Sequence, residues 1–149
     1  MKYILLITTF LCFAQSAISQ KSKVKFKKGI ILVDGVEFCK YEKIGGSNYS
    51  YKLNGEEFLY VKHRSVPTGK YHSNGHEIKD TYLVLHFTTT ELGSFESDLH
   101  IKVIIQQLIA NKVVENGKFN PEKAALFQKK FAEEVSSKYN KKIEININN

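Results

Sequence analysis

Apolar and polar residues alternate along two short stretches, and each stretch surrounds an Asp-Gly or Asn-Gly pair. Such a pair between strand-like runs indicates a β-hairpin, because a type I′ turn needs positive φ at both central residues. The first turn, Asp34-Gly35, predicts that Val33 pairs with Val36 and that Ile31 pairs with Phe38. Side chains alternate between the faces of a strand, so these four apolar residues share one face, which we expect to be buried.

The second turn, Asn54-Gly55, predicts a hairpin with an aromatic face. Its register pairs Tyr51 with Phe58 and Tyr49 with Tyr60. Lys52 and Glu57 then form a pair of opposite charge on the other face, and a slip of one residue would destroy both features. Aromatic residues favour strands, so packing within the sheet is the simpler interpretation of the four rings. The alternative is a stacking platform for a sugar or another flat ligand.

Residues 21–28 alternate lysine with apolar residues, which predicts a strand. Val24 and Phe26 then point inward, while Lys23, Lys25 and Lys27 point outward. Lysines on an edge strand prevent edge-to-edge aggregation, which is the simpler interpretation. The functional alternative is a basic strip that contacts an anionic surface.

Residues 65–80 show no periodicity and contain Asn74-Gly75. They predict a long loop, or a hairpin extension that turns at Asn74-Gly75. His72, His76 and Glu77 are candidate metal ligands, but the Asn-Gly pair between the two histidines breaks any helix that would align them. A solvated polar turn is therefore the preferred interpretation. With His63, these residues are the candidates for the alternative function, a small metal-dependent hydrolase-like enzyme that uses the loop at 63–80.

Helical periodicity replaces strand alternation after residue 94. Ser97 is placed to cap a helix from Asp98 to about Asn111, with a broad apolar face. The sequence Asn120-Pro121-Glu122 has the cap, proline and acidic residue that open a second helix. Its apolar stripe consists of Ala124, Phe127, Phe131 and Val135. Alternation returns at residues 142–148, which predicts either a final edge strand or a tail that becomes ordered on a partner.

These elements together predict an α+β fold. The expected architecture is an antiparallel β-meander of about five strands, followed by two amphipathic helices packed on one face and by the C-terminal edge strand if residues 142–148 form one.

The first 19 residues have the pattern of a secretory signal peptide. Lys2 precedes an apolar run that is too short to cross a membrane as a mature helix. Small residues before Gln20 favour cleavage between Ser19 and Gln20. We therefore expect an exported protein, periplasmic or secreted, with residues 20–149 as a single domain.

Cys39 is the one cysteine of the predicted mature chain, and it cannot form an internal disulfide. Its place in a strand predicts a buried thiol rather than a nucleophile. The formal net charge of the whole sequence is +7. Export argues against nucleic acid as the reason for this charge and favours a protein, a glycan or an anionic component of the cell envelope as partner.

No motif of a named chemistry appears, and no cofactor is predicted. The sequence therefore predicts a non-catalytic exported domain that binds a ligand or partner through its sheet. The expected contact residues are the aromatic cluster and the lysine rim: Tyr49, Tyr51, Phe58, Tyr60, Lys23, Lys25 and Lys27.

Overall fold

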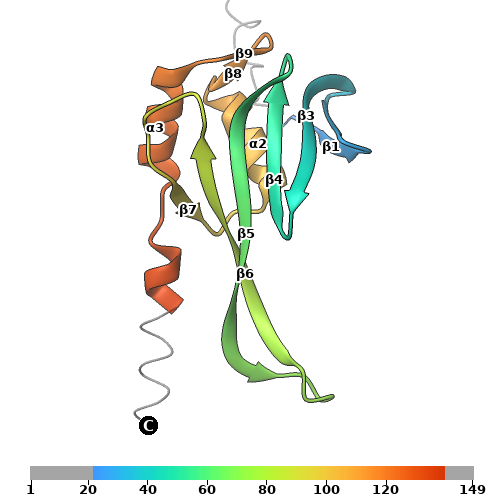
Figure 1. The fold of residues 1–149 in the computed structure, drawn as a ribbon, viewed down its shortest axis with the longest axis vertical. Helices are drawn as coiled ribbons and strands as arrows, with labels where there is room; N and C mark the ends of the chain where they lie inside the picture. Colours follow the sequence, from blue (N-terminus) through green and yellow to red (C-terminus); the bar gives the residue numbers. More distant parts are fainter. Residues whose placement is uncertain (1–21, 140–149) are drawn as a thin grey trace, which may run out of the picture.

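Seven strands follow one another along the chain and pair in the same order as one antiparallel sheet. They are β1 (Val24–Lys27), β2 (Ile30–Val33), β3 (Val36–Gly45), β4 (Asn48–Leu53), β5 (Glu56–Tyr71), β6 (Glu77–Phe87) and β7 (Phe95–Ser97). In the computed structural model, which describes residues 22–139, the sheet curls into an open half-barrel. Its two edges are β1 and β7 (Figure 1).

The predicted fold of about five strands and two packed helices is wrong, because the described chain is mostly sheet. The helices are short: α2 (Ile101–Ala110), α3 (Pro121–Phe131) and one turn at residues 135–139. A small hairpin of β8 (Val114–Glu115) and β9 (Lys118–Phe119) separates α2 from α3. The sequence analysis did not predict β7, because this strand has only three residues and an alternating pattern cannot be recognised over so short a stretch.

The two predicted hairpin turns are confirmed as type I′. Asp34 and Gly35 have φ of 51° and 90°, and Asn54 and Gly55 have φ of 52° and 90°. These values match the turn that suits the right-handed twist of antiparallel strands.

Both hairpins contain the same β-bulge, which the sequence analysis did not anticipate. In the first hairpin Val33 pairs with Val36 as predicted, but Ile31 pairs with Cys39, and Phe38 is the extra residue. The predicted pair of Ile31 with Phe38 is therefore wrong. Phe58 is the extra residue at the equivalent position of the second hairpin. Both loops share the sequence Asp/Asn-Gly-x-Glu-Phe, so the bulge recurs with its local sequence.

Strands β5 and β6 continue beyond the rest of the sheet as a two-stranded arm, which comprises residues 64–82 (Figure 1). β4 pairs with β5 only as far as Lys62, and β7 pairs with β6 only from Leu83 onward. The second interpretation of residues 65–80, a hairpin extension, is thus correct. At the arm's tip the His72 N–H donates to the His76 carbonyl at 2.8 Å.

Helix α2 supplies a large part of the core beneath the sheet, and Figure 1 shows it behind the central strands. It begins at Ile101 with His100 as cap, so the predicted start at Asp98 with Ser97 as cap is wrong. Ser97 is still extended, because it pairs with Leu83 in the sheet. The buried residues of α2 are Ile101, Ile104, Ile105 and Leu108.

Helix α3 begins as predicted and continues the core beside β7. The Asn120 side chain accepts a hydrogen bond from the Lys123 N–H at 3.0 Å, and Pro121 occupies the first turn. The Phe127 ring contacts the rings of Phe87 and Phe95, with centroids 6.1 and 6.2 Å apart. Ala124 and Phe127 of the predicted stripe are therefore core, and Phe131 packs against the core half-buried. Val135 is also buried, but α3 ends at Phe131, so Val135 lies outside the helix to which the stripe was assigned.

Two predictions fall outside the described residues: the signal peptide at residues 1–19 and the C-terminal strand at residues 142–148. The structure does not bear on either of them.

Cys39 is buried, as predicted, with 3% of its surface exposed. Burial, and to a smaller extent the nearby charge of Glu37, raise the pKa of its thiol from 9.0 to about 12. The folded state therefore resists ionisation of this thiol, whereas the unfolded chain ionises it near pH 9. The resulting stabilisation is fully present below pH 9 and is lost as the pH rises toward 12.

We therefore expect the free energy of unfolding to fall above pH 9 by up to about 1.4 kcal/mol per pH unit through Cys39 alone. Urea denaturation at several pH values between 8 and 11 measures this slope. Cys39→Ala should make the slope shallower but leave part of it, because burial also raises the pKa of Tyr51. An identical slope in Cys39→Ala would show that the thiol makes no such contribution.

Candidate ligand-binding site

The bulge at Phe58 decides which aromatic residues of the second hairpin lie together. Lys52 pairs with Glu57 as predicted, but Tyr51 then pairs with Leu59, and Tyr49 pairs with Val61. The predicted pairs of Tyr51 with Phe58 and of Tyr49 with Tyr60 are wrong, because the extra residue shifts the register by one beyond the bulge.

The four predicted aromatic contact residues therefore do not form one exposed platform. Tyr51 and Phe58 are each only 2% exposed and belong to the core. Tyr60 pairs with Ser50 and projects from the opposite face to Tyr49, and the Lys62 ammonium lies 5.6 Å from the centre of its ring. Only Tyr49 and Tyr51 remain together on the concave face.

A cavity of about 270 Å³ opens beside these two tyrosines. It is formed by β1, β3, β4 and β5 together with the start of α2. The lining residues are Phe26, Tyr41, Tyr49, Tyr51, His63, His100 and Ile101. Six of the seven carry a ring, so the walls are mainly flat and apolar.

The rings of the cavity contact one another and hold its shape. Phe26 meets Tyr41 edge to face, with centroids 5.4 Å apart, and Tyr41 stacks on Tyr51 at 6.0 Å. Tyr49 meets the His63 imidazole edge to face at 5.3 Å. These contacts couple three adjacent strands and the edge strand β1, so the walls are positioned by the sheet itself.

Two histidines from distant parts of the sequence line the same cavity. His63 lies where the arm leaves the sheet, and its backbone N–H donates a hydrogen bond to the Ser47 carbonyl at 2.9 Å. His100 caps α2, and its Nδ1 accepts a hydrogen bond from the Lys102 N–H at 3.2 Å. Burial, and then the proximity of His100, lower the pKa of His63.

The predicted lysine rim lies at the β1 edge. Lys23, Lys25 and Lys27 are exposed, whereas Phe26 between them contributes to the cavity. The Lys23 N–H donates to the Asp34 carboxylate at 2.8 Å, which ties the start of β1 to the first hairpin turn. The three lysines thus lie beside Phe26 along the β1 edge, but they do not line the cavity.

The residues considered as candidate metal ligands, for which a solvated turn was the preferred interpretation, lie at the tip of the arm. His72 and His76 are exposed, and Glu77 is half-buried. The Glu77 carboxylate accepts a hydrogen bond from the Gly69 N–H at 3.4 Å. Across residues 22–139 the structure brings together no group of three or more His, Cys, Asp or Glu side chains that could hold a metal ion.

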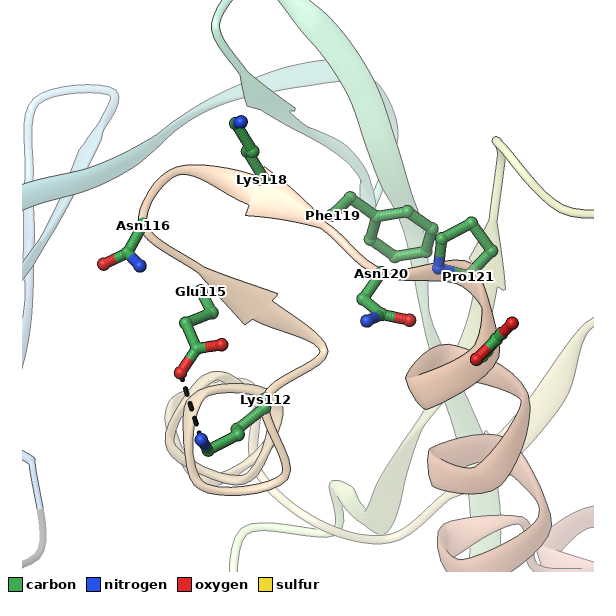
Figure 2. Close-up of a pocket in the computed structure, with 8 residues that line it drawn as sticks. Lys112, Glu115, Asn116, Lys118, Phe119, Asn120 and Pro121 are labelled. Atoms are coloured by element: carbon green, nitrogen blue, oxygen red, sulfur yellow. Dashed lines mark ion pairs between the residues drawn. The ribbon is translucent and has the colours of Figure 1, made fainter.

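A larger depression of about 750 Å³ lies between the β8–β9 hairpin and the start of α3 (Figure 2). Three of its polar side chains already have partners. The Lys112 ammonium pairs with the Glu115 carboxylate at 3.2 Å, as Figure 2 shows, and Asn120 caps α3. The Phe119 ring packs on Phe87 at 5.6 Å. We therefore take the smaller aromatic cavity as the candidate site.

Sequence reasoning missed Phe26, Tyr41, His100 and Ile101 as site residues. Phe26 was predicted to point inward, and Tyr41 lies two residues after Cys39 on the same strand. Alternation could have placed both on the concave face. His100 and Ile101 were assigned to the interior of a helix that in fact begins at Ile101, so their position at its start was not visible.

Comparisons with protein-family models, curated proteins and solved structures found no match to this chain. None of the helices within residues 22–139 combines the length and the apolar character that crossing a membrane requires.

Proposed function

We propose that this protein is a non-catalytic binding domain that holds a small ligand with a planar ring in the aromatic cavity. The observation that supports the proposal is the composition of the cavity wall, in which six of seven lining residues carry a ring. Flat aromatic surfaces attract planar groups through stacked and edge-to-face contacts, and ligand sites are mostly apolar with a few polar groups.

The size of the cavity favours a small ligand. A volume of about 270 Å³ corresponds to roughly nine water molecules at ~30 Å³ each. It lies just below the range of about 300–1,000 Å³ that is common for small-molecule sites. A single ring with one short substituent matches this space better than a fused ring system or a long chain.

Other parts of the proposal rest on the sequence alone. Export after cleavage near Ser19-Gln20 and an anionic envelope partner at the lysine rim remain predictions. The alternative of a metal-dependent hydrolase gains no support from the arm, where His72 and His76 sit at an exposed turn. We therefore put forward one function.

Replacing Tyr49 with alanine is expected to weaken the binding of ring compounds about tenfold, because it removes one aromatic wall. Ligand-observed NMR against a library of single-ring fragments identifies the binders, and titration gives their dissociation constants. Phe26→Ala should weaken binding similarly, because its ring also lines the cavity.

The matched control is Tyr60→Ala, which removes the same side chain from the same hairpin but from the other face of the sheet. It should leave the dissociation constants within about twofold. The proposal fails if no fragment binds at millimolar concentration, or if folded Tyr49→Ala and Phe26→Ala bind as tightly as the wild type.

A further inference from the structure

The polar side chains that line the aromatic cavity are tyrosines and histidines only. Apart from tyrosine hydroxyls, its lining side chains offer only the imidazoles of His63 and His100. Among its seven lining residues there is no aspartate or glutamate. A cavity with two imidazoles and no acidic group can attract negative charge and has no fixed group to repel it.

The hydrogen bonds of His100 determine what it offers to a ligand. Its Nδ1 accepts from the Lys102 N–H at 3.2 Å, so in the neutral ring the proton is on Nε2. Nε2–H is then a donor whether the ring is neutral or charged. The same hydrogen bond caps α2 and holds the neutral imidazole in this orientation, because a charged ring carries a proton on Nδ1 and cannot accept from the Lys102 N–H.

His63 lines the same cavity, with its ring edge to face against Tyr49. Burial, and then the proximity of His100, lower the pKa of His63. A ligand anion beside His63 would offset the effect of His100, because an opposite charge favours the charged form of the imidazole.

From this arrangement we infer that the ligand carries a carboxylate on its ring, that His63 and His100 bind the carboxylate, and that the tyrosines and Phe26 enclose the ring. This inference rests on the proposed function and narrows it from planar compounds in general to aromatic acids.

The surroundings of the two imidazoles determine how pH acts on the site. The titratable groups that line the cavity with them are Tyr41, Tyr49 and Tyr51, and burial raises the pKa of the Tyr51 hydroxyl. Lys43 on β3 is the register partner of Tyr49 on β4, so a lysine also lies close to the cavity. Because its pKa is lowered, the His63 imidazole gains its charge only as the pH falls below its ordinary pKa of 6.5.

Benzoate and benzamide provide the test, because they have the same shape and differ in charge. At pH 5.5 the wild type is expected to bind benzoate about tenfold more tightly than benzamide, and this preference should fall several-fold at pH 8. NMR titration of the full chain gives both dissociation constants.

His63→Gln and His100→Asn should each reduce the preference for benzoate over benzamide at pH 5.5, and asparagine at position 100 retains the helix cap. His72→Gln, at the arm's tip, should leave it unchanged.

The outcomes separate this inference from the proposed function. Equal binding of benzoate and benzamide would overturn the inference and leave the aromatic cavity as a binding site. Binding of neither compound would overturn the inference and count against the proposed function. A preference that persists undiminished at pH 8, or in both histidine variants, would assign the attraction to Lys43 and not to the imidazoles.

Discussion

Replacing Phe87 with alanine is expected to lower the free energy of unfolding by about 4 kcal/mol. Phe87 is completely buried, and its ring lies 5.8 Å from that of Phe95, 5.6 Å from Phe119 and 6.1 Å from Phe127. It therefore joins the sheet, the β8–β9 hairpin and α3. A loss of this size is a large share of the roughly 5–15 kcal/mol that stabilises an ordinary domain.

Tyr71→Ala is the matched control, because it removes an aromatic ring that is 65% exposed on the arm. It should change the free energy of unfolding by no more than about 0.5 kcal/mol. If Phe87→Ala does not fold, Phe87→Leu retains most of the volume and should cost about 1.5 kcal/mol. Urea denaturation measures all three variants, and a Phe87→Leu variant as stable as the wild type would contradict the assigned role.

Replacing Gly55 with valine is expected to cost about 2 kcal/mol of stability. Gly55 has φ of +90°, and a β-branched residue is strained there. A Cβ at this position would meet no atom within 4 Å, so the loss would come from the backbone and not from a clash. The second hairpin carries two walls of the cavity, and its turn must therefore be intact for the site to form.

Gly93→Val controls for the loss of backbone freedom in the unfolded chain. Gly93 also has open space around its Cβ position, but its φ lies outside the positive range. Denaturation of both variants in urea should show Gly93→Val close to the wild type and Gly55→Val clearly less stable. Equal effects of the two substitutions would show that positive φ at Gly55 is not what the turn requires.

The parts of the fold that the sequence predicted are those set by local chemistry. Asn54-Gly55 specifies a turn through φ, and Asn120-Pro121 specifies a helix start through hydrogen bonding, and both are confirmed. The bulge at Phe58 interrupts the alternation from which the register was inferred, and the three-residue β7 depends on contacts between segments, for which no local signal is sufficient. This difference explains why the turns were right while the register and the number of strands were wrong.

The candidate site was likewise predicted only in part from the sequence. Tyr49 and Tyr51 were selected for their aromatic character and do line the cavity, whereas Phe58 and Tyr60 were misplaced by the bulge. His63 and His100 are 37 residues apart in the sequence, and the path of the chain through β6 and β7 brings them to the same cavity. Residue pairs that distant cannot be matched from alternation within single strands.

The neighbour-to-neighbour order of the seven strands has a consequence for how the chain folds. Each strand pairs with the strand synthesised immediately before it, so each pairing closes only a short loop and costs little chain entropy. Such a low contact order favours rapid folding for a protein rich in sheet. The first hairpins can form before the later strands exist, but their apolar concave face stays open until α2 arrives. The interval before α2 docks is therefore when the chain is most prone to aggregate, and substitutions that delay this docking should lower the yield of soluble protein more than they lower its final stability.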